Sequence, residues 1–183
     1  MKCFIFIDGS NFYRAARFLI NDRSRSLLKF DYSEFSKFLC KGDEVVGIRY
    51  YIGAVKRVNK KSEILYADQQ RAIAFLQKHN IKVVLGTIIR HPDKTFHEKG
   101  VDIKLAVEMI RFARLNEYDK AILISSDTDF VPAVEEVQSF NKKVKYVAFP
   151  KNQSFGLTKV SDETILLRKE DLDNFFPDRK SRV

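Results

Sequence analysis

The sequence predicts an α/β fold with a mainly parallel central sheet. Short runs of consecutive apolar residues alternate along the chain with segments in which apolar residues recur every three or four positions. A continuous apolar run is typical of a strand buried on both faces, whereas the three- to four-residue spacing is typical of an amphipathic helix. Strands that alternate with helices indicate successive β-α-β units, whose strands run in parallel. Helices should therefore cover both faces of the sheet.

Five segments are rich enough in apolar residues and short enough to be strands. The first covers residues 3–7 and ends directly before Asp8. The other four strands are expected within residues 46–51, 83–85, 121–124 and 144–148.

Five segments between these runs have the spacing of helices. The clearest one places Leu105, Ala106 and Met109 on one face. Asp102 shares that face, so its side chain should point towards the sheet edge rather than into solvent. The helices are expected at residues 12–19, 32–39, 67–78, 101–115 and 130–140.

Two segments, residues 21–29 and 86–100, are irregular. The second is long for a connection between a strand and a helix, and either a hairpin or a flexible flap accounts for it. The chain has 183 residues, which suits one domain. We expect that domain at residues 1–176, followed by a frayed basic tail at residues 177–183.

The composition narrows the class of protein. Lys and Arg number 33 and Asp and Glu 24, a net charge of +9 that favours polyanionic partners such as nucleic acid. Two cysteines exclude a disulfide framework and a four-cysteine zinc site. The apolar runs are too short for a membrane span or a signal peptide, so we expect a cytoplasmic protein that does not enter a membrane. The sequence does not indicate its oligomeric state.

Four acidic residues are expected near one edge of the sheet. Asp8 directly follows the first predicted strand, Asp127 and Asp129 follow the fourth, and Asp102 opens the clearest helix. Ligands of open α/β sheets bind beyond the carboxyl ends of the strands, where the strand order reverses. If the first and fourth strands are neighbours, the four carboxylates converge. Clustered carboxylates repel one another unless a cation lies among them, and oxygen ligands suit Mg²⁺ or Mn²⁺.

Each of these residues also has a purely structural explanation. Aspartate is favoured at helix N-termini, because it accepts hydrogen bonds from free N–H groups and interacts with the helix dipole. Asn11 is a candidate for positioning water or phosphate, but Ser10 or Asn11 could equally cap the first helix. Turn chemistry explains Ser125 and Ser126 as well as a role in the site does. A phosphatase of the haloacid-dehalogenase type is disfavoured, because Ser10 stands where its second acid is needed.

Three short motifs connect these residues to a known family. They are Phe-Ile-Asp-Gly-Ser-Asn at residues 6–11, Lys-Gly-Val-Asp-Ile-Lys-Leu-Ala at residues 99–106, and Ser-Ser-Asp-Thr-Asp-Phe at residues 125–130. Together they resemble the three motifs of NYN domains, which belong to the PIN-like nuclease superfamily. Within that family the chain is most similar to the LabA-like branch.

The resemblance implies a Rossmann-like PIN fold and a metal-dependent ribonuclease site. The acidic positions of the family correspond here to Asp8, Asp102, Asp127 and Asp129, and its polar position corresponds to Asn11. We therefore expect hydrolysis of single-stranded or structured RNA by water activated at a bound Mg²⁺ or Mn²⁺ ion. Because NYN members include regulators, a non-catalytic RNA-binding or regulatory module is the alternative.

Basic residues are expected to contact the nucleic acid around this acidic centre. The candidates are Arg14, Lys56, Arg57 and Lys99, and a further basic patch lies at residues 142–145. Runs of charged residues are also typical of an ordinary solvated surface, and this interpretation of the basic residues stays open. Four aromatic residues are candidates for stacking on bases, although core packing is the commoner fate of such residues. These candidates are Phe12, Tyr13, Tyr51 and Phe96.

Overall fold

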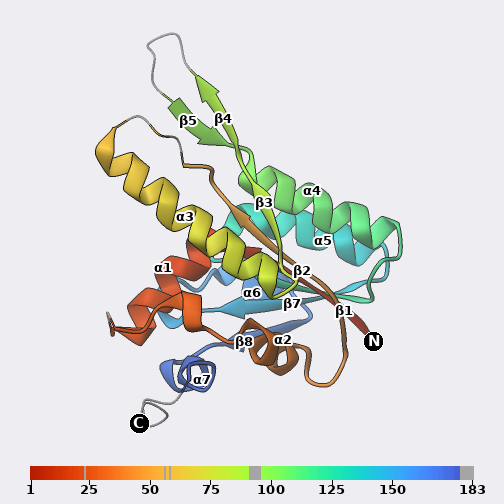
Figure 1. Cartoon of the computed structure of the whole chain (residues 1–183). Coiled ribbons are helices and arrows are strands. Elements are labelled where there is room, and N and C mark those ends of the chain that lie inside the picture. Colours follow the sequence, from red (N-terminus) through yellow and green to blue (C-terminus); the bar gives the residue numbers. More distant parts are fainter. Residues whose placement is uncertain (23, 56, 58, 91–95, 178–183) are drawn as a thin grey trace.

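The computed structural model describes residues 1–22, 24–55, 57, 59–90 and 96–177, with only the backbone for residues 88–90 and 96–99. In these ranges six strands form one parallel sheet in the order β3-β2-β1-β6-β7-β8 (Figure 1). The strands are β1 Lys2–Asp8, β2 Glu44–Ile52, β3 Lys82–Leu85, β6 Lys120–Ile124, β7 Lys143–Ala148 and β8 Glu163–Leu166.

The strand order reverses next to β1. The chain builds β2 and β3 on one side of β1 and then returns to place β6, β7 and β8 on the other side. Tyr51 of β2 lies opposite Asp8 in register, and Ile124 of β6 lies opposite Ile7. The first and fourth predicted strands are therefore neighbours, as the site prediction requires.

The central strand contributes to a core on each face of the sheet. Cys3, Ile5 and Ile7 of β1 belong to one buried cluster, whereas Phe4 and Phe6 belong to the other. Successive side chains of a strand point to opposite faces, so an unbroken apolar run is what a strand needs when both faces are covered.

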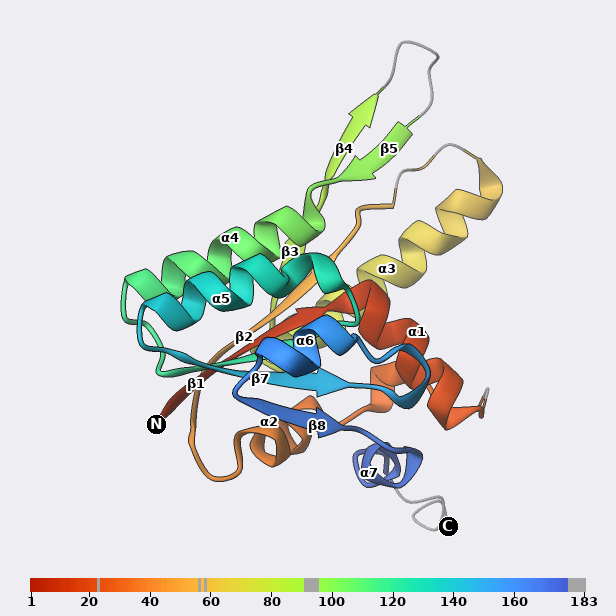
Figure 2. The same cartoon turned by 180° about the vertical axis from the view of Figure 1, so that it is seen from behind.

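Helices cover both faces of the sheet (Figures 1 and 2). On one face lie α1, α2, α3 and α7, and on the other lie α4, α5 and α6. Short 3-10 turns, η1, η2 and η3, occupy three of the connections. The bounds are α1 Gly9–Ile20, η1 Leu27–Lys29, α2 Tyr32–Cys40, α3 Lys60–Lys78, α4 Val101–Arg114, η2 Thr128–Phe130, α5 Val131–Ser139, η3 Pro150–Asn152, α6 Phe155–Val160 and α7 Lys169–Asp173.

The irregular segment before α4 contains a hairpin. Strand β4, Thr87–Arg90, pairs antiparallel with β5, Phe96–Lys99, and the pair projects from the sheet (Figure 1). Of the two expectations for this segment, the structure has the hairpin. Residues 91–95 lie outside the described part of the chain, as do residues 178–183 of the expected tail.

The α/β fold class with a parallel sheet is confirmed, and all five predicted strands and five predicted helices are present. Helix α3 begins earlier than predicted, at Lys60, because Asn59 and Ser62 form a capping box there. Elements β8, α6 and α7 were not predicted, because they are only four to six residues long and show little periodicity.

Ion pairs that involve two buried lysines join the strands at the amino edge of the sheet, opposite the candidate site. Asp43 accepts hydrogen bonds from Lys120 Nζ and from the N-terminal ammonium, each at 3.0 Å. Lys145 is fully buried, and its Nζ lies 3.1 Å from Glu163 Oε2 and 3.0 Å from the carbonyl oxygen of Leu39. These contacts tie the starts of β6, β7 and β8 to the chain around β2. Lys145 is therefore not part of a basic surface patch, contrary to the sequence-based expectation.

Candidate active site

Asp8 is the residue at which β1 ends and α1 begins. Its side chain is 3% exposed and caps α1 by accepting a hydrogen bond at Oδ1 from the backbone N–H of Asn11, 3.1 Å away. The Asn11 side-chain amide donates to Oδ2 of the same carboxylate. The capping role anticipated from the sequence is therefore present, and it holds a buried carboxylate at the carboxyl edge of the central strand.

Ser125 joins this carboxylate to the next strand of the sheet. It directly follows β6, is 1% exposed, and donates from Oγ to Asp8 Oδ2 at 2.8 Å. Its Oγ also accepts from the backbone N–H of Asp127 at 3.1 Å. Beside it, Ser126 donates to Asn11 Oδ1 at 2.7 Å. The two serines thus do more than shape a turn, because they connect the ends of β1 and β6.

Glycine is required next to Asp8. A Cβ atom on Gly9 would lie 2.2 Å from Tyr50 Cε1 and 2.3 Å from Ile52 Cγ2, far inside van der Waals contact. Burial, reinforced by the nearby Asp8 carboxylate, raises the pKa of Tyr50, so this hydroxyl stays protonated. It donates to the carbonyl oxygen of Gly9 at 3.2 Å. This contact holds the start of α1 against β2.

Asp127 and Asp129 form the turn after β6. The half-buried Asp127 caps η2, accepting at Oδ1 from the backbone N–H of Asp129 at 2.9 Å. Asp129 is exposed. Asp127 is linked to Asp8 through Ser125, so the structure brings together the first and third motifs identified in the sequence.

Asp102 lies in the first turn of α4, which follows Gly100 at a φ of 82°. Its side chain is exposed, whereas Val101, Leu105 and Met109 of the same helix are buried. The expectation that the Asp102 side chain points towards the sheet edge rather than into solvent is therefore wrong. At about 100° per residue, Asp102 lies on the same side of the helix as Leu105 and Met109, so helical periodicity alone did not predict its exposure.

A ready-made metal site does not appear in the described ranges, where no group of three or more His, Cys, Asp or Glu residues is spaced to hold an ion. The structure thus connects Asp8, Asn11 and the turn at Asp127. It does not present the four predicted carboxylates as one cluster. Their assignment as metal ligands stays a prediction.

A protein-family model matches most of the chain. The sequence model of the NYN domain matches residues 2–168. The chain belongs to the NYN family. This family is part of the PIN-like nuclease superfamily, whose members are generally metal-dependent ribonucleases. Placement in the LabA-like branch stays a prediction.

A solved structure supports the fold of this NYN domain over nearly its whole length. A protein of unknown function from Vibrio parahaemolyticus RIMD 2210633 superposes with a TM-score of 0.69 and 25% sequence identity, covering 96% of each chain. No curated protein matches the chain significantly.

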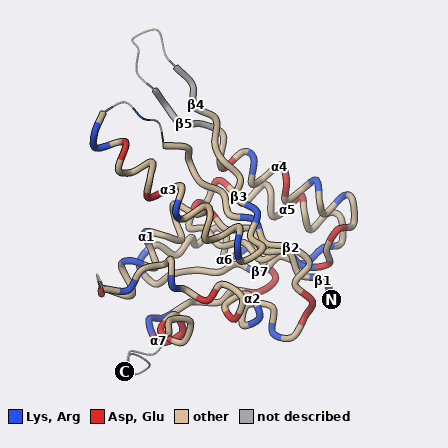
Figure 3. The backbone as a smooth tube through the Cα atoms, viewed as in Figure 1, with Lys and Arg blue, Asp and Glu red and all other residues tan. Residues whose placement is uncertain are grey.

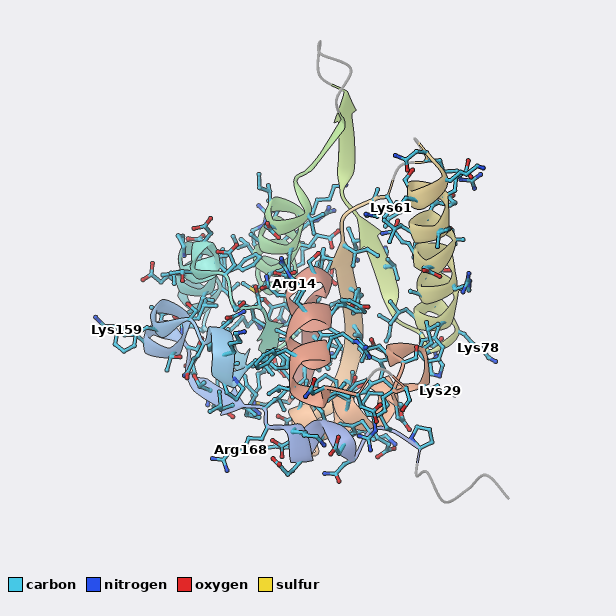
Figure 4. All side chains as sticks on the ribbon, turned by 90° about the vertical axis from the view of Figure 1, so that its left-hand side faces the viewer. Arg14, Lys29, Lys61, Lys78, Lys159 and Arg168 are labelled. Atoms are coloured by element: carbon cyan, nitrogen blue, oxygen red, sulfur yellow. The ribbon has the colours of Figure 1, made fainter. Side chains whose placement is uncertain are left out.

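Two of the four predicted nucleic-acid contacts of the NYN domain have described side chains. Arg14 is exposed on α1, where its Nε donates to the carbonyl oxygen of Ser10 at 3.2 Å (Figure 4). Arg57 precedes α3 and lies over the ring of Tyr66, 4.1 Å from its centroid. Lys56 lies outside the described residues, as does the side chain of Lys99.

The predicted stacking residues separate by burial. Tyr13 is 53% exposed on α1, so its ring is accessible. Phe12 and Tyr51 are fully buried in the two cores, and the idea that they stack on bases is therefore wrong. The side chain of Phe96 is outside the described part of the structure. Helical and strand periodicity shows which residues share a face, but the packing decides which face is open.

Over the described ranges, no helix of the NYN domain is long and apolar enough to cross a membrane.

Proposed function

We propose that this NYN domain is a Mg²⁺- or Mn²⁺-dependent ribonuclease that hydrolyses RNA phosphodiester bonds. The observation that carries the proposal is the buried Asp8 carboxylate at the reversal point of the sheet, joined through Ser125 to the turn at Asp127. Ligands of open α/β folds bind at this position. The family supplies the reaction class, since PIN-like nucleases generally use divalent ions to cleave RNA.

The side chains around Asp8 suit a hard divalent cation. The carboxylate, the Asn11 amide and the two serine hydroxyls offer oxygen atoms, which Mg²⁺ and Mn²⁺ prefer. A carboxylate has about four lone-pair sites, and described residues use three of those on Asp8. The residues present therefore fit such an ion.

Each residue of the site has a role in the proposed reaction. Asp8 and Asp127 would hold the ion, with Asp102 and Asp129 included on the strength of their motif positions. When bound, the ion would polarise a phosphoryl oxygen and activate water. The amide of Asn11, held by Ser126, would orient a water molecule or a phosphate oxygen. Ser125 would keep the Asp8 carboxylate in place.

Basic residues would hold the RNA across this centre. We propose phosphate contacts for Arg14 and Arg57 and, from the sequence, for Lys56 and Lys99. Such contacts give affinity without sequence preference by releasing counterions. Cys3 and Cys40 are free thiols buried in the core, which suits action in the reducing cytoplasm.

The test uses labelled single-stranded and structured RNAs with Mg²⁺, Mn²⁺ or a chelator. We expect the wild type to cleave only with metal, and Asp8→Asn to be inactive. Asp31→Asn is the matched control, because Asp31 caps α2 as Asp8 caps α1 but lies outside the site. Equal cleavage by wild type and Asp8→Asn would reject the proposal. RNA binding without cleavage under every metal condition would instead support the non-catalytic RNA-binding or regulatory module.

A further inference from the structure

A groove beside α1 has no role in the proposed reaction as described above. It has a volume of about 760 Å³ and lies between α1, η1 and α3, over the end of β2. In the view of Figure 4, β2 lies between α1 and α3. Gly9 and Ser10, the two residues that follow Asp8 in the chain, line one end of the groove. Whatever binds there can be continuous with a substrate at the candidate site.

The α1 wall of the groove offers a ring and a charge at helical spacing. Gly9, Tyr13 and Arg17 follow one another at four-residue steps, and all three line the groove. Half of Tyr13 is exposed to solvent. Arg17 donates from Nη1 to the carbonyl oxygens of Asp22 and Arg25, at 3.2 and 2.6 Å. Carbonyl oxygens carry no net charge, so these bonds fix the guanidinium without neutralising it.

Hydrogen bonds to the segment that follows β2 hold the α3 wall of the groove in place. Gln69 of α3 accepts from the backbone N–H of Val55 at 2.9 Å and donates to the carbonyl oxygen of Gly53 at 2.6 Å. All three residues line the groove. These bonds set the separation between α3 and the strand that forms the floor, so the groove is pre-formed rather than a gap between loose elements.

The charge of the groove favours an anionic occupant. Three arginines line it. Arg25 pairs with Asp173 and Arg71 pairs with Asp68. The bonds of Arg17 are to carbonyl oxygens, which do not neutralise its charge, so Arg17 is the arginine that can attract an anion. Its volume is within the range of about 300–1,000 Å³ that is common for sites of small organic ligands. Single-stranded nucleic acid is bound by the same combination of basic side chains with an aromatic ring, whereas duplex RNA is recognised across its wide minor groove.

We propose that this groove binds an unpaired segment of the RNA, with one base stacked on Tyr13 and the neighbouring phosphate at Arg17. The inference rests on the proposed ribonuclease function, because it gives that site its substrate class: RNA that is single-stranded next to the cleaved bond. The bound RNA would run from Asp8 along α1 towards η1.

Binding measured without metal tests this proposal independently of cleavage. The probes are a fluorescent unstructured oligouridine and an RNA duplex of equal length, in the presence of a chelator. Tyr13→Ala should weaken oligouridine binding about tenfold, as expected for the loss of one stacked base, and Tyr13→Phe should restore it. Duplex binding should be weaker and insensitive to Tyr13. The matched control is Phe18→Ala, since Phe18 is on the same helix and 54% exposed but outside the groove.

The possible outcomes separate the two proposals. Equal effects of Tyr13→Ala and Phe18→Ala, or unchanged binding by Tyr13→Ala, would overturn the groove assignment, even if Asp8-dependent cleavage is observed. Duplex binding that depends on Tyr13 would overturn the preference for single strands. Competition by uridine monophosphate as effective as by the oligouridine would assign the groove to a free nucleotide. Tyr13-dependent binding without cleavage would support the groove and reject the ribonuclease function.

Discussion

At the scale of single residues, the site depends on how the buried Asp8 carboxylate is held. Asp8 has a structural role as a helix cap and is placed where a ligand would bind, so the two interpretations of this residue are compatible. Its hydrogen bonds come from the backbone of α1, from Asn11 and from Ser125. Of these donors, Ser125 is the one that lies outside β1 and α1, directly after β6.

Ser125→Ala should therefore destabilise the protein by about 1–3 kcal/mol, because a buried charged acceptor loses a donor. Urea unfolding at neutral pH measures the change. Ser126→Ala is the control, since its hydroxyl donates to the neutral Asn11 amide, and its loss should be smaller. Equal losses from the two variants would show that Ser125 contributes no special stabilisation to the Asp8 carboxylate.

Asp102 is the acidic position for which structural and catalytic roles predict the most different results. As an exposed residue in the first turn of α4, it contributes about 0.3–1 kcal/mol through the helix dipole. Asp102→Asn should therefore leave the melting temperature nearly unchanged while cleavage falls by orders of magnitude. Glu34→Gln is the matched control, because Glu34 is an exposed acid in the first turn of α2. Full activity in Asp102→Asn would remove Asp102 from the site.

At the scale of elements, the two edges of the sheet are built in different ways. At the carboxyl edge, the start of α1 packs tightly on β2, with Gly9 against Tyr50 and Ile52. At the amino edge, ion pairs join the strand ends, with Asp43 and Glu163 receiving the ammonium groups of Lys120 and Lys145. One edge is therefore sensitive to volume and the other to charge.

Gly9→Ala should move α1 away from β2. The added methyl group has no space, and overpacking of this kind costs about 1–3 kcal/mol. Chemical denaturation should show the loss, and Ser10→Ala, at the exposed neighbouring position, should be close to neutral. A fully stable Gly9→Ala protein would mean that the contact with Tyr50 relaxes easily.

The amino edge should make the protein sensitive to acid. Hydrogen bonds from Lys120 and from the N-terminal ammonium lower the pKa of Asp43 to about 2. Because this folded-state pKa is below the usual value of about 3.9, the contribution of Asp43 to stability is present above about pH 4 and is lost as the pH falls towards 2.

Asp43→Asn should accordingly be less stable than the wild type at neutral pH, and the difference should shrink between about pH 4 and pH 2. Urea unfolding across this range measures it. Asp68→Asn, which alters an exposed pair with Arg71, should show a smaller difference. A difference between wild type and Asp43→Asn that does not vary with pH would contradict the assignment of the ion pair.

At the scale of the whole molecule, the net charge of +9 is not gathered in one place. Lys and Arg are spread over many elements and interleaved with Asp and Glu (Figure 3). Several of the basic side chains are engaged in ion pairs, including the buried Lys120 and Lys145. The part of the excess that contacts RNA is therefore a subset of the basic residues.

RNA affinity should fall linearly on a plot of log affinity against log salt concentration. Each phosphate contact to a single strand contributes about 0.7 to the slope, so changing Lys56 and Arg57 together to Ala should flatten it by about 1.4. Lys37→Ala, on α2 and paired with Glu34, should leave the slope unchanged. If the slope does not depend on Lys56 and Arg57, these residues do not contact phosphate.

The sequence by itself determined the α/β class, the five longer strands and the positions of the motifs. These features are local, since an apolar run such as residues 3–7 needs both faces covered wherever it lies. The sequence also placed Asp8 and Asp127 directly after strands, at one carboxyl edge, because parallel strands share that edge. That these two strands are neighbours came from the structure. Ser125 and Ser126 were recognised as polar, but nothing in a single sequence distinguishes a turn hydroxyl from one that bonds a buried carboxylate.

Only the tertiary structure decided which side chains are accessible and which elements meet. Phe12 and Tyr13 are adjacent in the sequence, but packing against the sheet buried the first and exposed the second. Charge alone made Lys145 a surface residue, whereas the fold buries it against Glu163. The groove is formed by α1, η1, β2 and α3, which are separate segments of the chain between residues 9 and 76. Such a feature depends on how the elements pack together, and no local pattern of residues encodes it.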